Sequence, residues 1–221
     1  MKTKISPYVI AIAILTILTF FVMPLSQETY AKNVDLTKGK EGRAEIAVLR
    51  NLHTNEKIYL PVRIDKGKDA NSVNYEVFVP SSILSYESHQ HSDITGGVTL
   101  TITQNYTEKF SPEYAVSVSS SSAKWTKSDN TISITNASVT SFVSGYISGG
   151  GYLTKNETRS IGIPSLNYVY YQYPSWAGTY IIIDEISYQA SRADSTLVRG
   201  GSSWSLGFCV AQGGQQSLAC E

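Results

Sequence analysis

Apolar and hydroxyl-bearing side chains alternate along several segments of this chain. In residues 98–103 the alternation places Val98, Leu100 and Ile102 on one side of an extended backbone and three threonines on the other. A strict period of two is typical of an antiparallel sheet with one face against a core and the other in water. The many Ser, Thr, Tyr, Val and Ile residues also favour strands. We therefore predict an all-β fold, an antiparallel β-sandwich for which a jelly-roll arrangement is one option.

Turn-forming residues divide the chain into short strands. The pattern predicts hairpin turns at 52–56 and 128–130, and a helical turn just after Pro80. The polar segment 87–97 indicates a loop inside a single domain that spans residues 32–221. The predicted strands are 43–50, 57–64, 73–79, 97–104, 114–126, 131–136, 139–147, 158–163, 178–189 and 203–211, with a short return strand at 216–220.

The N-terminus has the order of a secretory signal peptide. Lys2 and Lys4 precede an apolar run over residues 8–22, and small residues around Ala31 suit a signal peptidase. We expect cleavage near Ala31 and secretion of residues 32–221 into the extracellular space. An uncleaved membrane anchor is the alternative, although the apolar run is shorter than the roughly 20 residues that span a bilayer.

The charge of the mature chain limits its partners. Removing residues 1–31, which hold two lysines and one glutamate, leaves 16 basic and 17 acidic residues. A domain so close to neutrality has no electrostatic reason to bind nucleic acid or an anionic membrane. We expect the partner to be a cell-wall polymer, a glycan or another extracellular protein, and membrane contact only if the protein forms pores.

Cys209 and Cys220 are the only cysteines, and both lie near the end of the chain. An even number of cysteines in a secreted protein predicts a disulfide. The bridge would close a loop of about eleven residues, which the chain-entropy model values at about 2.5–3 kcal/mol. Because Gly213 and Gly214 lie within that loop, we expect the disulfide to pin a C-terminal hairpin.

His89, His91 and Asp93 alternate within the polar segment and would point to one side of an extended chain. Two imidazoles and a carboxylate could begin a site for zinc or another divalent metal, which makes a metal-dependent hydrolase one functional alternative. His53 is the only other histidine, and a solvated loop accounts for the same residues. We adopt the loop interpretation and expect no cofactor.

No catalytic signature is visible elsewhere in the sequence. No serine lies in a G-x-S-x-G frame, and both cysteines are assigned to the disulfide. Asp184 and Glu185 are sequence neighbours that a strand would point to opposite faces, so they do not form a catalytic pair of carboxylates. The sequence therefore favours a non-catalytic protein over an enzyme.

Aromatic residues gather between positions 168 and 180. Tyr168, Tyr170, Tyr173 and Trp176 offer flat, amphipathic surface of the kind that extracellular domains use to hold sugars. Alternation splits the rings, with Tyr168 and Tyr170 on one face of a strand and Tyr173 on the other. The alternative is that these rings belong to the core and a structural turn. From this stretch we predict a non-catalytic extracellular binding module.

Residues 114–147 form a long hydroxyl-rich segment around one turn. Pore-forming toxins insert hairpins of this composition into membranes, with one face toward lipid and the other toward water. An ordinary water-soluble hairpin has the same pattern. A secreted toxin or bacteriocin-like, membrane-active protein is therefore the alternative function.

Overall fold

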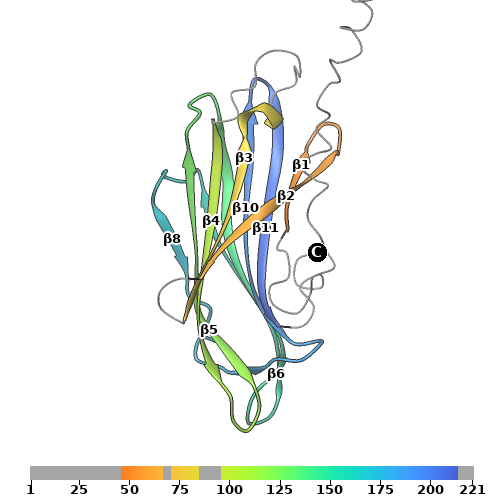
Figure 1. The fold of residues 1–221 in the computed structure, drawn as a ribbon, viewed down its shortest axis with the longest axis vertical. Coiled ribbons are helices and arrows are strands. Elements are labelled where there is room, and N and C mark those ends of the chain that lie inside the picture. The colour runs from red at the N-terminus through yellow and green to blue at the C-terminus, as the bar shows by residue number, and fades with distance from the viewer. Residues whose placement is uncertain (1–45, 67–70, 85–95, 214–221) are drawn as a thin grey trace, which may run out of the picture. The chain divides into compact units, whose positions relative to one another are not determined.

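The computed structural model describes residues 46–66, 71–84 and 96–213, and this part of the chain is all-β, with no α-helix. Long strands run side by side through most of it (Figure 1). The strands are β1 (Ile46–Asn51), β2 (Lys57–Lys66), β3 (Ser72–Pro80), β4 (Gly97–Lys109), β5 (Ala115–Lys127), β6 (Ser133–Tyr146), β7 (Tyr152–Gly162), β8 (Val169–Gln172), β9 (Ile181–Ile182), β10 (Tyr188–Arg199) and β11 (Ser202–Gly213), and a short 3-10 helix, η1 (Ser81–Leu84), follows β3.

The strands form one antiparallel sheet that is nearly closed into a barrel. Hydrogen-bonded neighbours follow the order β7-β6-β10-β11-β1-β2-β3-β4-β5-β8, and β9 pairs with β5. A bridge from Ile147, just beyond β6, to Ile181 of β9 brings the two ends of this order together. β2 connects the two halves of the sheet, because its residues 57–61 pair with β1 and its residues 62–66 pair with β3 (Figure 1). The predicted sandwich of two separate sheets is therefore not confirmed.

An apolar core lies between the two halves of this sheet. In β4 the predicted alternation is confirmed, since Val98, Leu100 and Ile102 are fully buried and the threonines between them are half-buried. Trp125 of β5 is the largest fully buried side chain, and its indole N–H donates to the hydroxyl of Ser195 in β10 at 3.1 Å. Burying a tryptophan contributes about 4–6 kcal/mol of transfer free energy.

A polar layer adjoins the apolar core. The amide of Gln104 in β4 donates to the hydroxyl of Ser191 in β10 at 2.9 Å, and Ser191 shares a hydrogen bond with Ser121 of β5. Gln104, Ser121 and Ser191 are fully buried, so these bonds satisfy groups that water cannot reach. The single strand predicted at 178–189 is wrong: the structure has the short β9 in this range and a separate β10 that begins at Tyr188 with small polar residues facing inward.

The predicted hairpin between residues 114 and 147 is wrong. β5 pairs with β4, β8 and β9, whereas β6 pairs with β10 and β7. β5 and β6 instead face each other across the interior, where the hydroxyls of Ser141 and Ser121 are 3.5 Å apart. β4 has the same length as β5 and pairs with it along that length through the short turn at 110–114. The turn at 128–130 consequently crosses between the two halves of the sheet.

Two other local predictions are confirmed. β1 and β2 form a hairpin around residues 52–56, where the side chain of Asn51 accepts the backbone N–H groups of His53 and Thr54. The helical turn expected after Pro80 is η1. Asn51 is a polar residue whose side chain replaces missing backbone partners, which is the usual reason for asparagine in turns.

Several predictions fall outside the described residues. They are the signal peptide at 1–31, the segment that holds His89, His91 and Asp93, the return strand at 216–220, and Cys220. Cys209 is described and is buried in β11. The disulfide between the two cysteines therefore stays a prediction.

Candidate functional site

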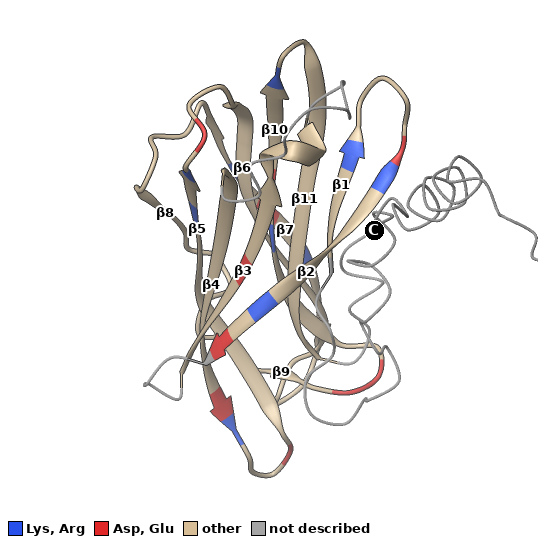
Figure 2. Ribbon diagram, turned by 45° about the horizontal axis from the view of Figure 1, so that its top comes forward, with Lys and Arg blue, Asp and Glu red and all other residues tan. Residues whose placement is uncertain are grey.

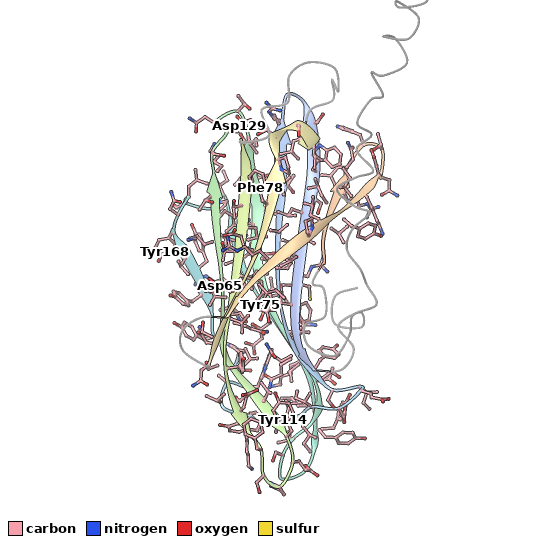
Figure 3. All side chains as sticks on the ribbon, viewed as in Figure 1. Asp65, Tyr75, Phe78, Tyr114, Asp129 and Tyr168 are labelled. Atoms are coloured by element: carbon pink, nitrogen blue, oxygen red, sulfur yellow. The ribbon has the colours of Figure 1, made fainter. Side chains whose placement is uncertain are left out.

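The aromatic stretch is divided between surface and interior. Tyr168 lies beside β8 and is exposed (Figure 3). Tyr173 is exposed as well. Tyr170 is half-buried and packs edge-on against Trp125 at 6.1 Å between ring centroids. Trp176 is only 4% exposed and belongs to a small apolar cluster that includes Ile181 of β9. The four residues predicted from the sequence do not share one surface.

A further ring, Tyr171, points outward from β8. It lies opposite Ser122 of β5, so both side chains are on the outer face of the sheet. Its ring stacks on Tyr173 with centroids 5.9 Å apart and planes at 15°. Tyr171 and Tyr173, the tyrosine pair, are 43% and 67% exposed and present a flat aromatic surface to solvent.

Beside the tyrosine pair, two rows of side chains cross β2, β3, β4, β5 and β8. Residues directly opposite each other in neighbouring antiparallel strands point to the same face, so the register defines the rows. The first row is Arg63, Glu76, Thr101, Lys124 and Val169, and the second is Asp65, Asn74, Thr103, Ser122 and Tyr171. Only Val169 has no polar group in its side chain.

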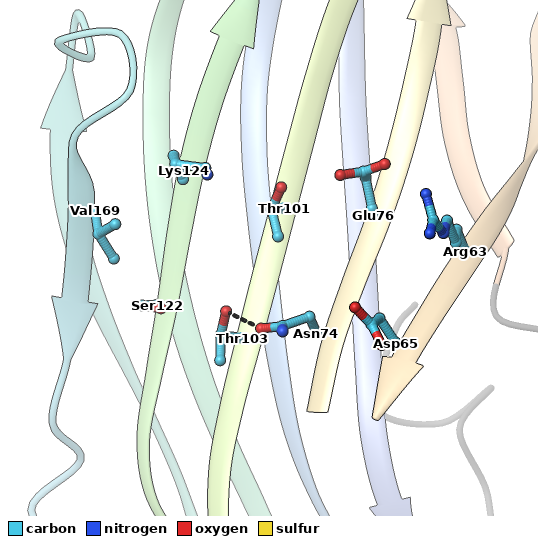
Figure 4. Close-up of a pocket in the computed structure, with 9 residues that line it drawn as sticks. All are labelled: Arg63, Asp65, Asn74, Glu76, Thr101, Thr103, Ser122, Lys124 and Val169. Atoms are coloured by element: carbon cyan, nitrogen blue, oxygen red, sulfur yellow. Dashed lines mark hydrogen bonds between the residues drawn. The ribbon is translucent and has the colours of Figure 1, made fainter. Parts of the chain in front are cut away.

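These rows line an open groove of about 280 Å³ (Figure 4). All members of the two rows except Tyr171 line it. Thr103 donates its hydroxyl to Asn74 Oδ1 at 2.7 Å, which fixes the amide and leaves its nitrogen as a donor. Pockets for apolar small molecules are enclosed and mostly hydrophobic. This groove is polar and open, and it suits a ligand that carries many hydroxyl groups.

Four charged side chains occupy the groove, and they are unevenly placed. Figure 4 labels the four, and Figure 2 shows charged positions along the ribbons of β2, β3 and β5. Arg63 lies opposite Glu76, and Asp65 is two residues further along β2, whereas Lys124 has only Thr101 and Val169 opposite it. Within the described part of the chain, none of the four makes an ion pair or a side-chain hydrogen bond. Their donors and acceptors are therefore open to a ligand.

The edge strand β7 holds the tyrosine pair in place. Arg159 donates from Nη1 to the carbonyl oxygen of Tyr171, and its guanidinium lies over the ring of Tyr170 at 5.7 Å. The carboxylate of Glu157 accepts the N–H of Ser175 at 2.9 Å, and hydrogen bonding by Ser175 lowers the pKa of Glu157. Both contacts join β7 to residues 171–175, which include the tyrosine pair, so Arg159 and Glu157 position it.

The groove is better suited to binding than to catalysis. Asp65 is exposed and Glu76 is half-buried, and neither lies in the enclosed, water-poor surroundings that acid–base catalysis uses. In the described ranges, no three His, Cys, Asp or Glu side chains are grouped so that they could hold a metal ion. Among the same residues no helix has the length and apolar character needed to cross a membrane. No protein-family model, curated protein sequence or solved structure matches this chain.

The groove residues were not predicted from the sequence. They come from five strands, and the register that joins residue 63 to residue 169 cannot be derived from local spacing. One signal was available in β4, where Thr101 and Thr103 face outward between buried apolar residues. β3 repeats this signal with Asn74 and Glu76. A polar outer face was therefore predictable, but the neighbours that complete it were not.

Proposed function

We propose that this protein is a non-catalytic extracellular binding module that recognises a carbohydrate, on a cell-wall polymer or another glycan, through the groove and the tyrosine pair. The observation that carries the proposal is the adjacency of the two. Free charged and hydroxyl side chains lie directly beside two stacked, exposed tyrosines on the same face. The N-terminal signal sequence supports an extracellular location.

The physical argument starts from the two kinds of surface that a sugar ring presents. Its hydroxyls are both donors and acceptors, and charged side chains such as Glu76 and Arg63 make stronger hydrogen bonds to them than neutral groups do. Its C–H face is apolar and packs on aromatic rings such as Tyr171. A rigid sheet holds both surfaces in fixed positions, so little conformational entropy is lost when the ligand binds.

The structure changes the residues that we assign to the ligand. Trp176 packs in the interior, so the proposed aromatic contact is made by Tyr171 and Tyr173, with Tyr168 at its border. Tyr170 supports the site from below through its contact with Trp125. The proposal thus keeps the aromatic stretch but uses its outward-facing rings.

The test is a pull-down of the secreted, purified protein on insoluble wall polymers and immobilised glycans. The Tyr171→Ala variant should lose most of the binding, because the ring supplies the apolar contact. Tyr146→Ala is the matched control, since Tyr146 is 50% exposed and lies at the end of β6 rather than on β8. Equal loss in both variants, or wild-type binding that Tyr171→Ala leaves intact, would contradict the assignment of this site.

A membrane-active protein is the second candidate. The observation that favours it is a group of exposed rings at the turns that join β4 to β5 and β6 to β7. Phe110 stacks on Tyr114 at 5.4 Å, and Tyr146 packs edge-on against Tyr152 at 5.0 Å. Amphipathic rings of this kind favour a membrane–water interface. The candidate predicts dye release from lipid vesicles, which Phe110→Ser should reduce; intact vesicles at micromolar protein would remove it.

We also propose that Cys209 forms a disulfide with Cys220. Cys209 is buried in β11, the last described strand, and Cys220 follows it eleven residues later in the sequence, which supports this pairing. Mass spectrometry of non-reduced peptides should find the two cysteines linked. A Cys209→Ser variant should lose about 2.5–3 kcal/mol of stability. An unlinked pair in the secreted protein would refute the proposal.

A further inference from the structure

The distribution of charge in the groove bears on which carbohydrate it would hold. Lys124 extends from β5 into the groove between Thr101 and Val169 (Figure 4). Its neighbours along β5 on the same face, Ser122 and Thr126, are neutral. The Lys124 side chain is half-buried, and it makes no ion pair with any residue that the structure describes.

The other three charges lie at the opposite end of the groove. Glu76 is separated from Lys124 by the whole of β4, which puts their backbones about 10 Å apart at the usual spacing of strands. Glu76 faces Arg63 across one ladder, and Asp65 adds a second carboxylate to that end. Acidic groups therefore outnumber basic ones at the end of the groove formed by β2 and β3. At the end formed by β5, Lys124 is the one charged residue among the described residues that line the groove.

Lys124 is also the charged residue of the groove that lies nearest to the tyrosine pair. Tyr171 is opposite Ser122, two residues from Lys124, and is thus a diagonal neighbour at about 7–8 Å between backbones. A sugar ring packed on Tyr171 would bring its substituents toward the ammonium. A cation without a counter-charge gains more from an anionic group than from a hydroxyl.

We infer that the carbohydrate carries a negative group, a carboxylate or a phosphate, which Lys124 binds while Tyr171 packs against the sugar ring. This rests on the proposed function, and it names the ligand class that the site selects. The end formed by Asp65 and Glu76 receives neutral hydroxyls, because a second anionic group would be repelled there. Selection therefore favours polymers whose charges are spaced along the chain over densely charged ones.

The experiment measures affinity for three polymers at low and physiological salt. Glucuronoxylan carries carboxylates spaced along a xylan chain, lightly phosphorylated xylan carries spaced phosphates, and xylan without acidic substituents is neutral. Lys124→Gln removes the ammonium, Lys124→Arg keeps the charge, and Lys155→Gln is the control because Lys155 is exposed on β7. Unchanged thermal unfolding of all variants confirms that they are folded.

We expect at least one anionic polymer to bind more tightly than xylan. Lys124→Gln should weaken that binding by about tenfold, while Lys124→Arg and Lys155→Gln change it by less than about twofold. Which anionic polymer responds identifies the carboxylate or the phosphate as the recognised group. Tight binding of xylan that depends on Tyr171 but not on Lys124 would overturn this inference and leave the proposed function standing. Failure of every glycan and wall polymer to bind would overturn both.

Discussion

The buried amide of Gln189 offers a sharp test of how the sheet is closed. β8 pairs with β5 at residues 121–124 and β9 pairs with it at 115–116, so the stretch between them has no strand partner on that side. Gln189, from β10, fills this place with its side chain. Its Oε1 accepts the N–H of Val118 at 3.2 Å, and its Nε2 donates to the carbonyl of Val116 at 2.6 Å.

A Gln189→Ala substitution removes both of these bonds at once. Gln189 is 1% exposed, so water cannot replace the lost amide without entering the interior. A buried backbone group left without a partner costs about 1–3 kcal/mol. Two such groups and the space left by the side chain give an expected loss of about 3–4 kcal/mol, which lowers the Tm by roughly 10 °C for a domain of this size.

Chemical denaturation of the purified protein measures this loss. Gln212→Ala is the matched control, because Gln212 is half-buried and donates to Gln104 and Tyr75 over longer distances of 3.2 and 3.4 Å. The control should lose only about 1–2 kcal/mol, because it takes the partner from one buried acceptor, Gln104 Oε1, rather than from two backbone groups. If Gln189→Ala were no more destabilising than Gln212→Ala, the claim that the Gln189 amide takes the place of a strand partner for β5 would be refuted.

Three further perturbations have defined outcomes. Hydrogen bonding by Thr131, then by Ser81, lowers the pKa of Asp129 to about 2, so its contribution to stability is present above about pH 4 and is lost as the pH falls toward 2. Asp129→Asn should therefore cost about 1 kcal/mol at pH 7, after allowance for solvent screening, and nothing at pH 2 in urea titrations. Gly201→Ala should cost about 1 kcal/mol in the same assay, because φ is +85° although no atom obstructs a Cβ. Arg159→Ala should weaken glycan binding severalfold without unfolding the protein, as circular dichroism and affinity measurements together would show.

The all-β class was predictable because its signal is local. Val98, Leu100 and Ile102 are buried as their alternation predicts, and the hairpin around 52–56 follows from turn residues. Which strands are neighbours depends on residues far apart in the sequence. The local sequence pattern therefore predicted a hairpin of β5 with β6, whereas β5 pairs with β4. β10 escaped detection because Ser191 and Ser195, which face inward, resemble a polar loop in sequence.

The candidate site shows the same division between local and distant information. The aromatic stretch was visible in the sequence, and so was the split of its rings between two faces of a strand. Its outward-facing member Tyr171 and its inward-packed Trp176 were distinguished only by the course of the chain around β8 and β9. Arg63, Glu76 and Lys124 are brought together solely by the register of four strands.

NMR chemical-shift mapping of the purified protein, with soluble fragments of the wall polymers and glycans used for the pull-down, is the most direct test of the proposed carbohydrate binding. We predict that the largest amide shifts fall on the groove and the tyrosine pair, around Glu76, Thr101, Lys124 and Tyr171. The turns near Tyr146 should not shift. Shifts confined to those turns, or no shifts at saturating fragment, would contradict the claim that this face of the sheet recognises a carbohydrate.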